Sequence, residues 1–490
     1  MKKSLSQTIR IGLLLWVSAV LFILAGCENR TTPPVVNPVS LNIEVRYTQE
    51  GNRSLYLLVH DRGGNLLQTH VVDTSKPSPQ TLHLDQVPEE GYVSAAQITR
   101  THRTWPVEGD YDVLYVTSFS TKVVERLQDF AFYFSDWGWV GYHYTNHLEK
   151  RGWVSVSGSC PSEATYLMAY DFDIAWYGFN HVPCQNGSIV GNGRTVGSDL
   201  QTDGKISLVL WAMRSWTQPM GQYALVLDHD PAQDISITTG DYQSATRTWT
   251  VRVNGVPPAY QDLEAYYYIV GVRKGATLAG YSTANHDACQ GATSDQLCAR
   301  ATTADLGDKI DARIMRVGLK RETSQFHTFT LLWKPVNNLS QDQSVGFREF
   351  EEPFESWSLS ADLRKLQLGG GKAGKSQAYN FYAIDANQKK YLYIRVFSLD
   401  AGSQTAVFPV LPNAITQKFP VQKSAYGYGQ ITFTRYDRDH LPPYVVPPLN
   451  QTARALVILG SWGSLQSLSW LEDNTLNPEG KANPAPSDFQ

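Results

Sequence analysis

Short β-favouring runs, many with alternating apolar and polar residues, recur along almost the whole chain. Examples are SLYLLVH at Ser54–His60, KISLVLWAM at Lys205–Met213, FHTFTLLW at Phe326–Trp333 and GQITFTRY at Gly429–Tyr436. Alternation places successive side chains on opposite faces of a strand, so these runs favour strands with one buried face. Turn sequences such as RGGN, TDGK and NGVPP separate the runs. Many short strands punctuated in this way predict an all-β fold made of β-sandwiches.

Helical patterning is scarce. The two segments for which we expect a helix are Thr121–Asp129 and Asp305–Lys320, and a strand is the alternative for both.

A weak internal repeat indicates how the chain is divided. The segments YDVLYV, YALVLD, HTFTLL and RALVIL begin at residues 111, 223, 327 and 454, each at the end of a strand-rich block. The spacing is that of one immunoglobulin-like sandwich. We therefore predict four tandem β-sandwich modules, followed by a polar, disordered tail at 476–490. The predicted modules are residues 41–150, 151–237, 238–345 and 346–475.

The first forty residues predict export and a lipid anchor. Lys2, Lys3 and Arg10 precede an apolar run that is too short for a membrane span, and Leu-Ala-Gly-Cys ends it at Cys27. This order resembles the signal peptide and lipobox of bacterial lipoproteins. The resemblance implies that residues 1–26 are cleaved and that Cys27 is acylated and inserted in the bilayer. An ordinary secretory signal is the alternative, and it also exports the chain.

Two further features of this region bear on the location. Residues 27–40 are rich in proline and read as an extended tether. Glu28 stands where an Asp would favour inner-membrane retention in many lipoproteins, so the resemblance favours the outer membrane or the cell surface.

The cysteines fit an exported chain. Apart from Cys27 there are four, Cys160, Cys184, Cys289 and Cys298, and an even number in an exported protein predicts disulfides. Of the three possible connectivities, we favour the local one, Cys160 with Cys184 and Cys289 with Cys298. A zinc site is the competing interpretation, but the chain has no C-x-x-C pair.

The second module resembles the bacterial Ig-like repeats of surface proteins. Three stretches carry the resemblance: VSVSGSCPSEAT at Val154–Thr165, CQNGSI at Cys184–Ile189 and DGKISLVLWA at Asp203–Ala212. The chain departs from that pattern by an aromatic insertion between the two cysteines. The resemblance implies a β-sandwich used as a spacer or adhesive stalk, with no shared catalytic residues.

Two ligand classes are disfavoured. GGGKAGKS at Gly369–Ser376 fits the phosphate-binding loop pattern, but the β-favouring SQAYNFYAID follows it where a helix is required, so we expect no nucleotide. The leader carries three of the 42 basic residues and none of the 46 acidic ones, which leaves a net charge of about −7. A chain of this charge is not built to bind nucleic acid.

Aromatic residues offer the best candidate ligand site. Trp137, Trp139 and Tyr142 lie in FAFYFSDWGWVGYHY, and Trp153 follows soon after. Trp176 and Tyr177 lie in a second aromatic segment. Exposed rings of this kind could stack on sugars, whereas burial between modules is the simpler interpretation and the one we favour.

Calcium is the metal for which the sequence offers a candidate set of ligands. Asp228, Asp230 and Asp234 follow an apolar strand close to a predicted module boundary, where β-sandwich proteins often bind calcium. A polar turn explains the same residues, and we favour it; we therefore expect no cofactor.

No catalytic motif is present, so we do not expect an enzyme. We expect a membrane-anchored, extracytoplasmic lipoprotein with a structural or adhesive role, whose partner is a protein or a glycan. The alternatives are a glycan-capturing lipoprotein that uses the aromatic residues and an exported hydrolase whose site the sequence does not reveal.

Overall fold

The computed structural model describes most of the chain between residues 37 and 463. The described ranges are 37–47, 54–103, 108–127, 130–134, 140–143, 151–169, 180–190, 194–215, 218–260, 262–263, 268–274, 276–280, 283–285, 295–304, 306, 309–322, 326–336, 343–350, 356–369, 375–399, 405–437 and 452–463.

The chain is all-β, as predicted. The described α-helices are α2 (Thr121–Arg126) and α5 (Asn413–Thr416), and three single 3-10 turns accompany them, η1 (Thr239–Asp241), η4 (Phe347–Glu349) and η5 (Lys423–Ala425). None of the helices within the described ranges has the length and apolar character needed to cross a bilayer.

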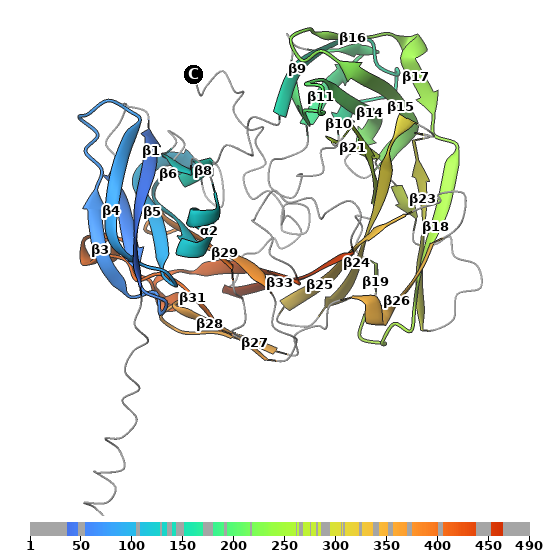
Figure 1. The fold of residues 1–490 in the computed structure, drawn as a ribbon. Helices are drawn as coiled ribbons and strands as arrows, with labels where there is room; N and C mark the ends of the chain where they lie inside the picture. The colour runs from blue at the N-terminus through green and yellow to red at the C-terminus, as the bar shows by residue number, and fades with distance from the viewer. Residues whose placement is uncertain are drawn as a thin grey trace, which may run out of the picture.

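A 13-stranded sheet runs through the molecule, and its far ends come from distant parts of the chain (Figure 1). Its strands, in spatial order, are β21 (Ala276–Gly280), β20 (Tyr268–Arg273), β24 (Ala312–Glu322), β25 (Phe326–Pro335), β33 (Ala453–Gly463), β32 (Tyr428–Tyr436), β29 (Ser376–Asp385), β30 (Lys390–Leu399), β6 (Gly109–Ser120), β5 (Tyr92–Arg103), β2 (Ser54–His60) and β3 (Leu66–Val71), with β19 (Asp262–Leu263) beside β24.

Strands β6 and β30 pair in parallel, whereas each pairs in an antiparallel manner with its other neighbour, β5 or β29. Lys390 pairs with Asp112 at one end of this ladder and Phe397 with Phe119 at the other. Strands of the predicted segments 41–150 and 346–475 therefore lie in one sheet. The division of the chain into four modules stays a prediction.

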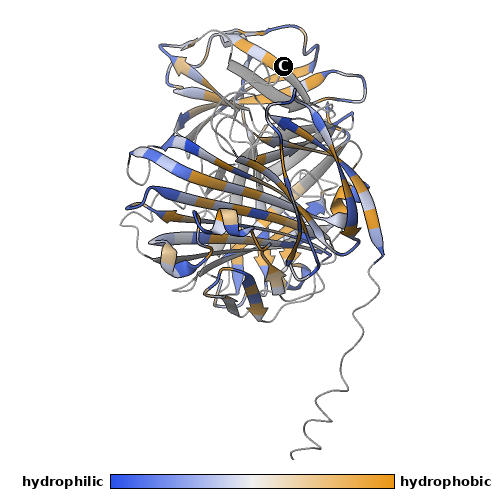
Figure 2. Cartoon of the chain, turned by 90° about the vertical axis from the view of Figure 1, so that its left-hand side faces the viewer, coloured by the Kyte–Doolittle hydropathy of each residue, from blue (hydrophilic) through white to orange (hydrophobic). Residues whose placement is uncertain are grey.

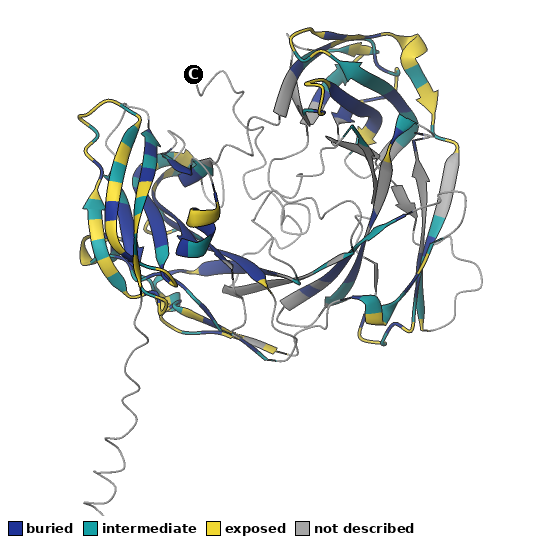
Figure 3. Cartoon of the chain, in the orientation of Figure 1, coloured by how far each residue is buried: buried dark blue, intermediate teal, exposed yellow. Residues whose placement is uncertain are grey.

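A second sheet covers one face of this region. Its strands are β4 (Gln80–Pro88), β1 (Pro38–Tyr47), β7 (Ala131–Phe134) and β8 (Val140–His143). Ile43, Val45 and Phe132 from this sheet pack with Val113 and Phe119 of β6 in one buried cluster. The dark strands in Figure 3 show this buried layer beneath the exposed outer surface of β4.

A third layer covers the opposite face. It consists of β27 (Ser356–Leu359), β28 (Lys365–Gly369), β31 (Thr405–Val407) and the segment around α5. Leu366, Phe408 and Ile415 of this layer pack on Phe381 and Ile394 of the large sheet. Because both faces are covered, β29 and β30 are buried on both sides, whereas apolar and polar residues alternate along many other strands (Figure 2).

Residues 151–244 form a sandwich of two sheets. One contains β12 (Ser188–Ile189), β11 (Asn180–Gln185), β10 (Tyr166–Ala169), β14 (Ile206–Ser215), β15 (Gln218–His229) and β17 (Tyr242–Ser244), and the other contains β13 (Arg194–Asp199), β9 (Arg151–Gly158) and β16 (Ile235–Ile237). Val156, Leu210 and Ile237 pack between them. Gly158 has φ +109°, and a Cβ there would collide with the carbonyl of Ile237, so the close approach of β9 and β16 requires glycine.

A four-stranded sheet packs on β24 and β25. Its strands are β22 (Thr283–Asn285), β23 (Gln296–Thr303), β18 (Arg247–Asn254) and β26 (Gln343–Gly346). Val251 and Val253 of β18 contact Met315, Val317 and Leu332 of the large sheet.

The two helical predictions had different outcomes. The helix expected over Thr121–Asp129 is confirmed as α2, which spans Thr121–Arg126. The helix expected over Asp305–Lys320 is wrong, because β24 occupies Ala312–Glu322. Met315, Val317 and Leu319 alternate inward there, and β20 and β25 pair with the two sides of the strand.

The glycine-rich motif behaves as the sequence analysis predicts. Ser376, which ends GGGKAGKS, begins the strand β29 and not a helix. The helix N-terminus that a phosphate-binding loop requires does not follow the motif.

Candidate functional site

Most of the aromatic candidates fall outside what can be described. Trp137, Trp139, Trp176 and Tyr177 lie outside the described residues, and Trp153 is described only through the backbone of β9.

Tyr142, on β8, packs against the large sheet. Its ring centroid lies 4.6 Å from that of Phe119 and 5.6 Å from that of Phe397. Tyr142 is partly buried and contributes to the contact between two layers, whereas the burial expected of the other aromatic candidates stays a prediction.

The local disulfide expected for the second module is present. Cys160 and Cys184 are bonded, with their Cα atoms 6.3 Å apart. Cys298 is also disulfide-bonded, whereas its predicted partner Cys289 and the predicted acylation site Cys27 lie outside the described residues.

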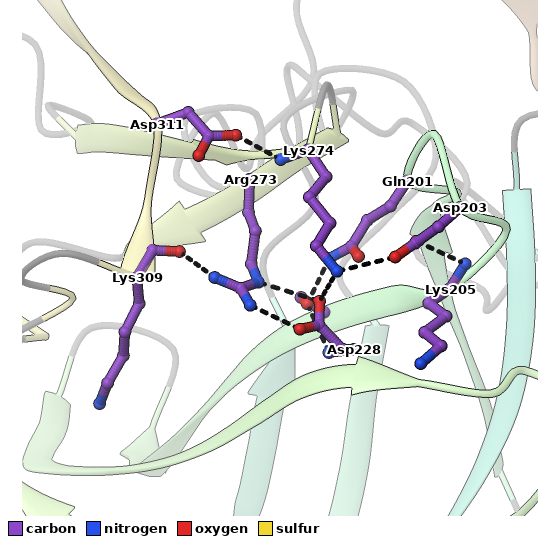
Figure 4. A network of polar contacts seen from close by, with 9 residues as sticks. Gln201, Asp203, Lys205, Asp228, Arg273, Lys274, Lys309 and Asp311 are labelled. Carbon is purple, nitrogen blue, oxygen red and sulfur yellow. Dashed lines mark hydrogen bonds and ion pairs between the residues drawn. The ribbon is translucent and has the colours of Figure 1, made fainter.

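Asp228, one of the three calcium candidates, forms an ion pair with the large sheet. It is the next-to-last residue of β15 and has a φ of +52°. The Nε and Nη2 atoms of Arg273 donate to its Oδ1 and Oδ2 atoms at 3.0 and 2.5 Å, and Lys274 Nζ lies 3.2 Å from Oδ1. Both carboxylate oxygens are thus engaged by cations from β20 and the turn that follows it, an arrangement drawn in Figure 4.

Neighbouring groups hold the two cations in place. Lys274 Nζ also donates to Asp203 Oδ2 at 2.7 Å, and its backbone amide donates to Asp311 Oδ2 at 2.5 Å. Arg273 Nη1 donates to the carbonyl of Lys309 at 2.6 Å (Figure 4). We call Asp203, Asp228, Arg273, Lys274 and Asp311 the junction network, because it joins the 151–244 sandwich to the large sheet.

Electrostatics in the junction network favour the charged forms. The hydrogen bond from Arg273 is the main reason that the pKa of Asp228 lies far below its ordinary value, and Lys274 adds to the effect. Reciprocally, the hydrogen bond to Asp228 raises the pKa of Arg273, and the hydrogen bond to Asp203 raises that of Lys274. The side chains of Asp228 and Arg273 are 27% and 19% exposed, so solvent screens this pair only in part.

An apolar contact accompanies the junction network. Trp211 and Met168, on the sheet that contains β15, form one buried cluster with Ala304, Leu306 and Ile310. This cluster lies outside the sandwich core, between the 151–244 sandwich and the segment that precedes β24. The contact therefore combines buried apolar area with a partly buried ion pair.

The other calcium candidates do not join Asp228 in a ligand set. Asp230 Oδ1 accepts a hydrogen bond from the amide of Ala232 at 2.9 Å, as expected of a polar turn, and Asp234 is exposed. Among the described residues, no group of three or more His, Cys, Asp or Glu side chains is placed to hold a metal ion. A calcium ion at Asp228 would have to displace Arg273 and Lys274.

A buried histidine forms a second polar cluster, on the large sheet. His60, Ser94 and Ser118 are all 0% exposed. His60 Nε2 lies 3.0 Å from the carbonyl of Val410, and Ser94 Oγ lies 3.2 Å from His60 Nδ1 and 2.6 Å from Ser118 Oγ. Because a carbonyl can only accept, Nε2 carries the proton and Nδ1 accepts from Ser94.

His60 has a structural role. Burial lowers its pKa to about 4, so the ring is neutral near pH 7. Serine, histidine and a further polar group are the components of a nucleophilic site, but all three side chains here are inaccessible and no carboxylate is among the contacts described above. The ring instead ties the segment at Val410 to the sheet.

Sequence reasoning missed Arg273, Lys274 and His60. Asp228 stood out because it ends an apolar strand, but the two cations lie about 45 residues further along the chain. Only the fold brings them to it.

No protein-family model, curated protein or solved structure matches this chain.

Proposed function

We propose that the chain is a lipid-anchored, extracytoplasmic protein with a structural or adhesive role, and that it presents its β-layers to a partner as one body. The leader and Cys27 motif of the sequence support the anchor, because they resemble a lipoprotein signal. The Cys160–Cys184 bond supports an oxidising compartment, where such bonds persist.

The junction network is the observation that carries the structural part of this proposal. A tether and flexible domains would need no bidentate ion pair and no buried apolar cluster between the 151–244 sandwich and the large sheet. Fixing the two together suits a protein that must hold a binding surface at a defined distance and orientation from the membrane. The resemblance of residues 151–237 to Ig-like repeats of surface proteins points in the same direction.

The anchor is tested by acylation. Cells that express the wild type are grown with an alkyne analogue of palmitate, and the protein is recovered and examined for label. We expect labelled protein in the membrane fraction, and unlabelled, released protein for Cys27→Ser. An unlabelled wild type would contradict the anchor.

The interaction role is tested separately on the same cells. A membrane-impermeant amine cross-linker is applied, and the tagged protein is recovered under denaturing conditions. We expect a discrete cross-linked species that disappears in Cys27→Ser and weakens in Arg273→Ala, because the loosened junction no longer orients the surface. Recovery of uncross-linked protein alone would refute an adhesive or structural partner while leaving the anchor intact.

A further inference from the structure

A cleft of about 600 Å³ opens where strands β2, β5, β6 and β30 of the large sheet begin or end, on the face that α5 helps to cover. The cleft is lined by Arg100, Asp112 and Lys390, which lie side by side on the adjacent strands β5, β6 and β30. Asp112 pairs with Arg100 of β5 on one side and with Lys390 of β30 on the other. Residues opposite one another in neighbouring strands project from the same face of the sheet, so these three charged side chains form one wall of the cleft.

Lys418 brings a further positive charge from the covering layer. It follows α5 and lines the same cleft, and its neighbour Phe419 is 1% exposed in the core beneath that layer. The buried ring of Phe419 fixes the backbone from which Lys418 extends. The cleft therefore draws charged residues from two layers that are far apart in sequence.

The cations of the cleft have acidic neighbours, but its two lysines form no described ion pair. Three cations and one carboxylate line it. Two further described acids lie beside it: Asp110 Oδ2 is 3.9 Å from Arg100 Nε, and Asp385 is opposite Lys390 in the ladder between β29 and β30. Within the described ranges, neither Lys390 Nζ nor Lys418 Nζ has an ion-pair partner. The adjacent Lys389 differs, because its Nζ donates to the carbonyl of Glu108 at 3.0 Å and lies 5.0 Å from the ring centroid of Tyr111.

This concentration of positive charge stands out in a chain whose net charge is −4. Cations gathered in a concave site attract anions more strongly than the same cations spread over a surface. Lysine binds phosphate as a point charge, and arginine binds it through two parallel hydrogen bonds. Ser54, which also lines the cleft, has a hydroxyl that can accept or donate a hydrogen bond to a polar ligand.

We propose that the cleft formed by Arg100, Lys390 and Lys418 binds a small polar molecule that carries a phosphate monoester. The two lysines, which form no described ion pair, can contact the oxygens of such a group, whose charge is about −1.5 to −2 at pH 7. The volume lies within the range of small-molecule sites. A free sugar phosphate and a phosphorylated lipid headgroup offer the same chemistry, and this site is independent of the proposed anchor and scaffold role.

Binding is measured with the mature full chain. Glucose 6-phosphate is titrated calorimetrically at low ionic strength, with glucose as the uncharged matched probe. In parallel, sedimentation is measured with vesicles of phosphatidylcholine containing phosphatidic acid, whose headgroup is a phosphate monoester, and with vesicles of phosphatidylcholine alone. We expect binding to at least one phosphate probe and to neither uncharged counterpart.

Charge variants decide whether the cleft is responsible. Lys390→Gln with Lys418→Gln should weaken binding about tenfold or more, and Asp112→Asn should strengthen it, because an opposing carboxylate is removed. Lys205→Gln, an exposed lysine of the 151–244 sandwich, is the matched control and should bind as the wild type does. Near-ultraviolet circular dichroism verifies that each variant is folded.

The outcomes separate cleanly. Binding of the sugar phosphate assigns a soluble ligand, and binding of phosphatidic acid vesicles alone assigns a headgroup. Failure of both phosphate probes, equal binding of the uncharged probes, or unchanged affinity in the double lysine variant overturns the proposal.

Discussion

The contact between β6 and β30 and the contact between Asp228 and Arg273 both join distant parts of the chain, but by different interactions. The first is a backbone ladder from Lys390–Asp112 to Phe397–Phe119 with apolar layers on both faces. The second depends on side chains, the junction network and the cluster around Trp211. Most surface substitutions leave the hydrogen bonds of a main-chain ladder intact, whereas salt, acid or the loss of one partner weakens an ion pair.

Acid weakens polar interactions in both regions of the molecule, but in different pH ranges. Neutral His60 ties the segment at Val410 to the large sheet that contains β6 and β30, and ionised Asp228 supports the junction network. A pH titration can therefore distinguish the two regions. Variants of a core residue, of the buried histidine, of the disulfide and of the ion pair extend the comparison.

Phe119→Ala should have the largest effect. Phe119 is fully buried, and its ring centroid lies 4.8 Å from that of Phe397 across the β6–β30 ladder and 5.1 Å from that of Phe130. We expect a loss of about 3–5 kcal/mol in the free energy of unfolding in urea, from lost transfer energy and a residual cavity. Val71→Ala, at a position 68% exposed, is the control and should change it by less than about 0.5 kcal/mol. A cost below about 1 kcal/mol for Phe119→Ala would mean that the ladder does not depend on this core.

Acid should have the next largest effect, through His60 and its contact with Val410. Its folded pKa of about 4 lies below the ordinary 6.5 because burial disfavours the cation. The unfolded chain therefore binds a proton first, so the stability from neutral His60 is complete above pH 6.5 and is lost as pH falls toward 4. The loss should be roughly 3 kcal/mol between pH 7 and pH 4.

The measurement is urea unfolding across that pH range for the wild type and His60→Asn. The substituted side chain cannot gain the proton, so the pH dependence between 6.5 and 4 should flatten even though the variant is less stable at pH 7. Parallel curves for the two proteins would show that another group controls this range.

Removing the disulfide should destabilise only the 151–244 sandwich. Cys160 and Cys184 are separated by 24 positions, and the chain-entropy model gives about 3 kcal/mol for a loop of this order. Hydrogen exchange should therefore accelerate in β10 and β14 in Cys160→Ser with Cys184→Ser. Unchanged protection in β29 and β30 is expected, since the ladder does not need the bond. Loss of protection throughout would indicate that the two regions unfold together.

Arg273→Ala should have the smallest effect of the four. The pair with Asp228 is bidentate but partly exposed, so we expect a loss of about 1 kcal/mol that shrinks at high salt. Arg62→Ala removes a 2.8 Å pair with Glu90 whose side chains are 76% and 47% exposed, and it should cost less than about 0.5 kcal/mol.

The same pair has a pH signature below that of His60. Because the pKa of Asp228 is depressed, its contribution is present above the ordinary value of 3.8 and is lost as pH falls below it. Arg273→Ala should therefore reduce the acid sensitivity below about pH 4 and leave the range from 6.5 to 4 unchanged. If it altered the higher range, the assignment of the two pH windows would be wrong.

Strand positions could be predicted from sequence because the signal is local. Ser54–His60, for instance, is both the predicted run and the observed β2. Local pattern misled at Asp305–Lys320, where β24 depends on the strands that pair with it. Partner choice has no local signal at all, which is why the meeting of β6 with β30 could not be foreseen.

The candidate sites show the same limit. The Cys160–Cys184 bond was predictable because the two residues are only 24 positions apart, within one predicted module. The ion pair of Asp228 with Arg273, and the row formed by Arg100, Asp112 and Lys390, combine residues that only long-range pairing brings together.

The parallel ladder of β6 and β30 has a consequence for biogenesis. About 270 positions separate Phe119 from Lys390, so the ribosome synthesises β6 long before its neighbour β30. During that interval one edge of β6 lacks the strand that occupies it in the finished sheet, and such an edge invites pairing with other chains. A newly made chain that stalls before residue 390 would therefore need a chaperone more than the completed one does.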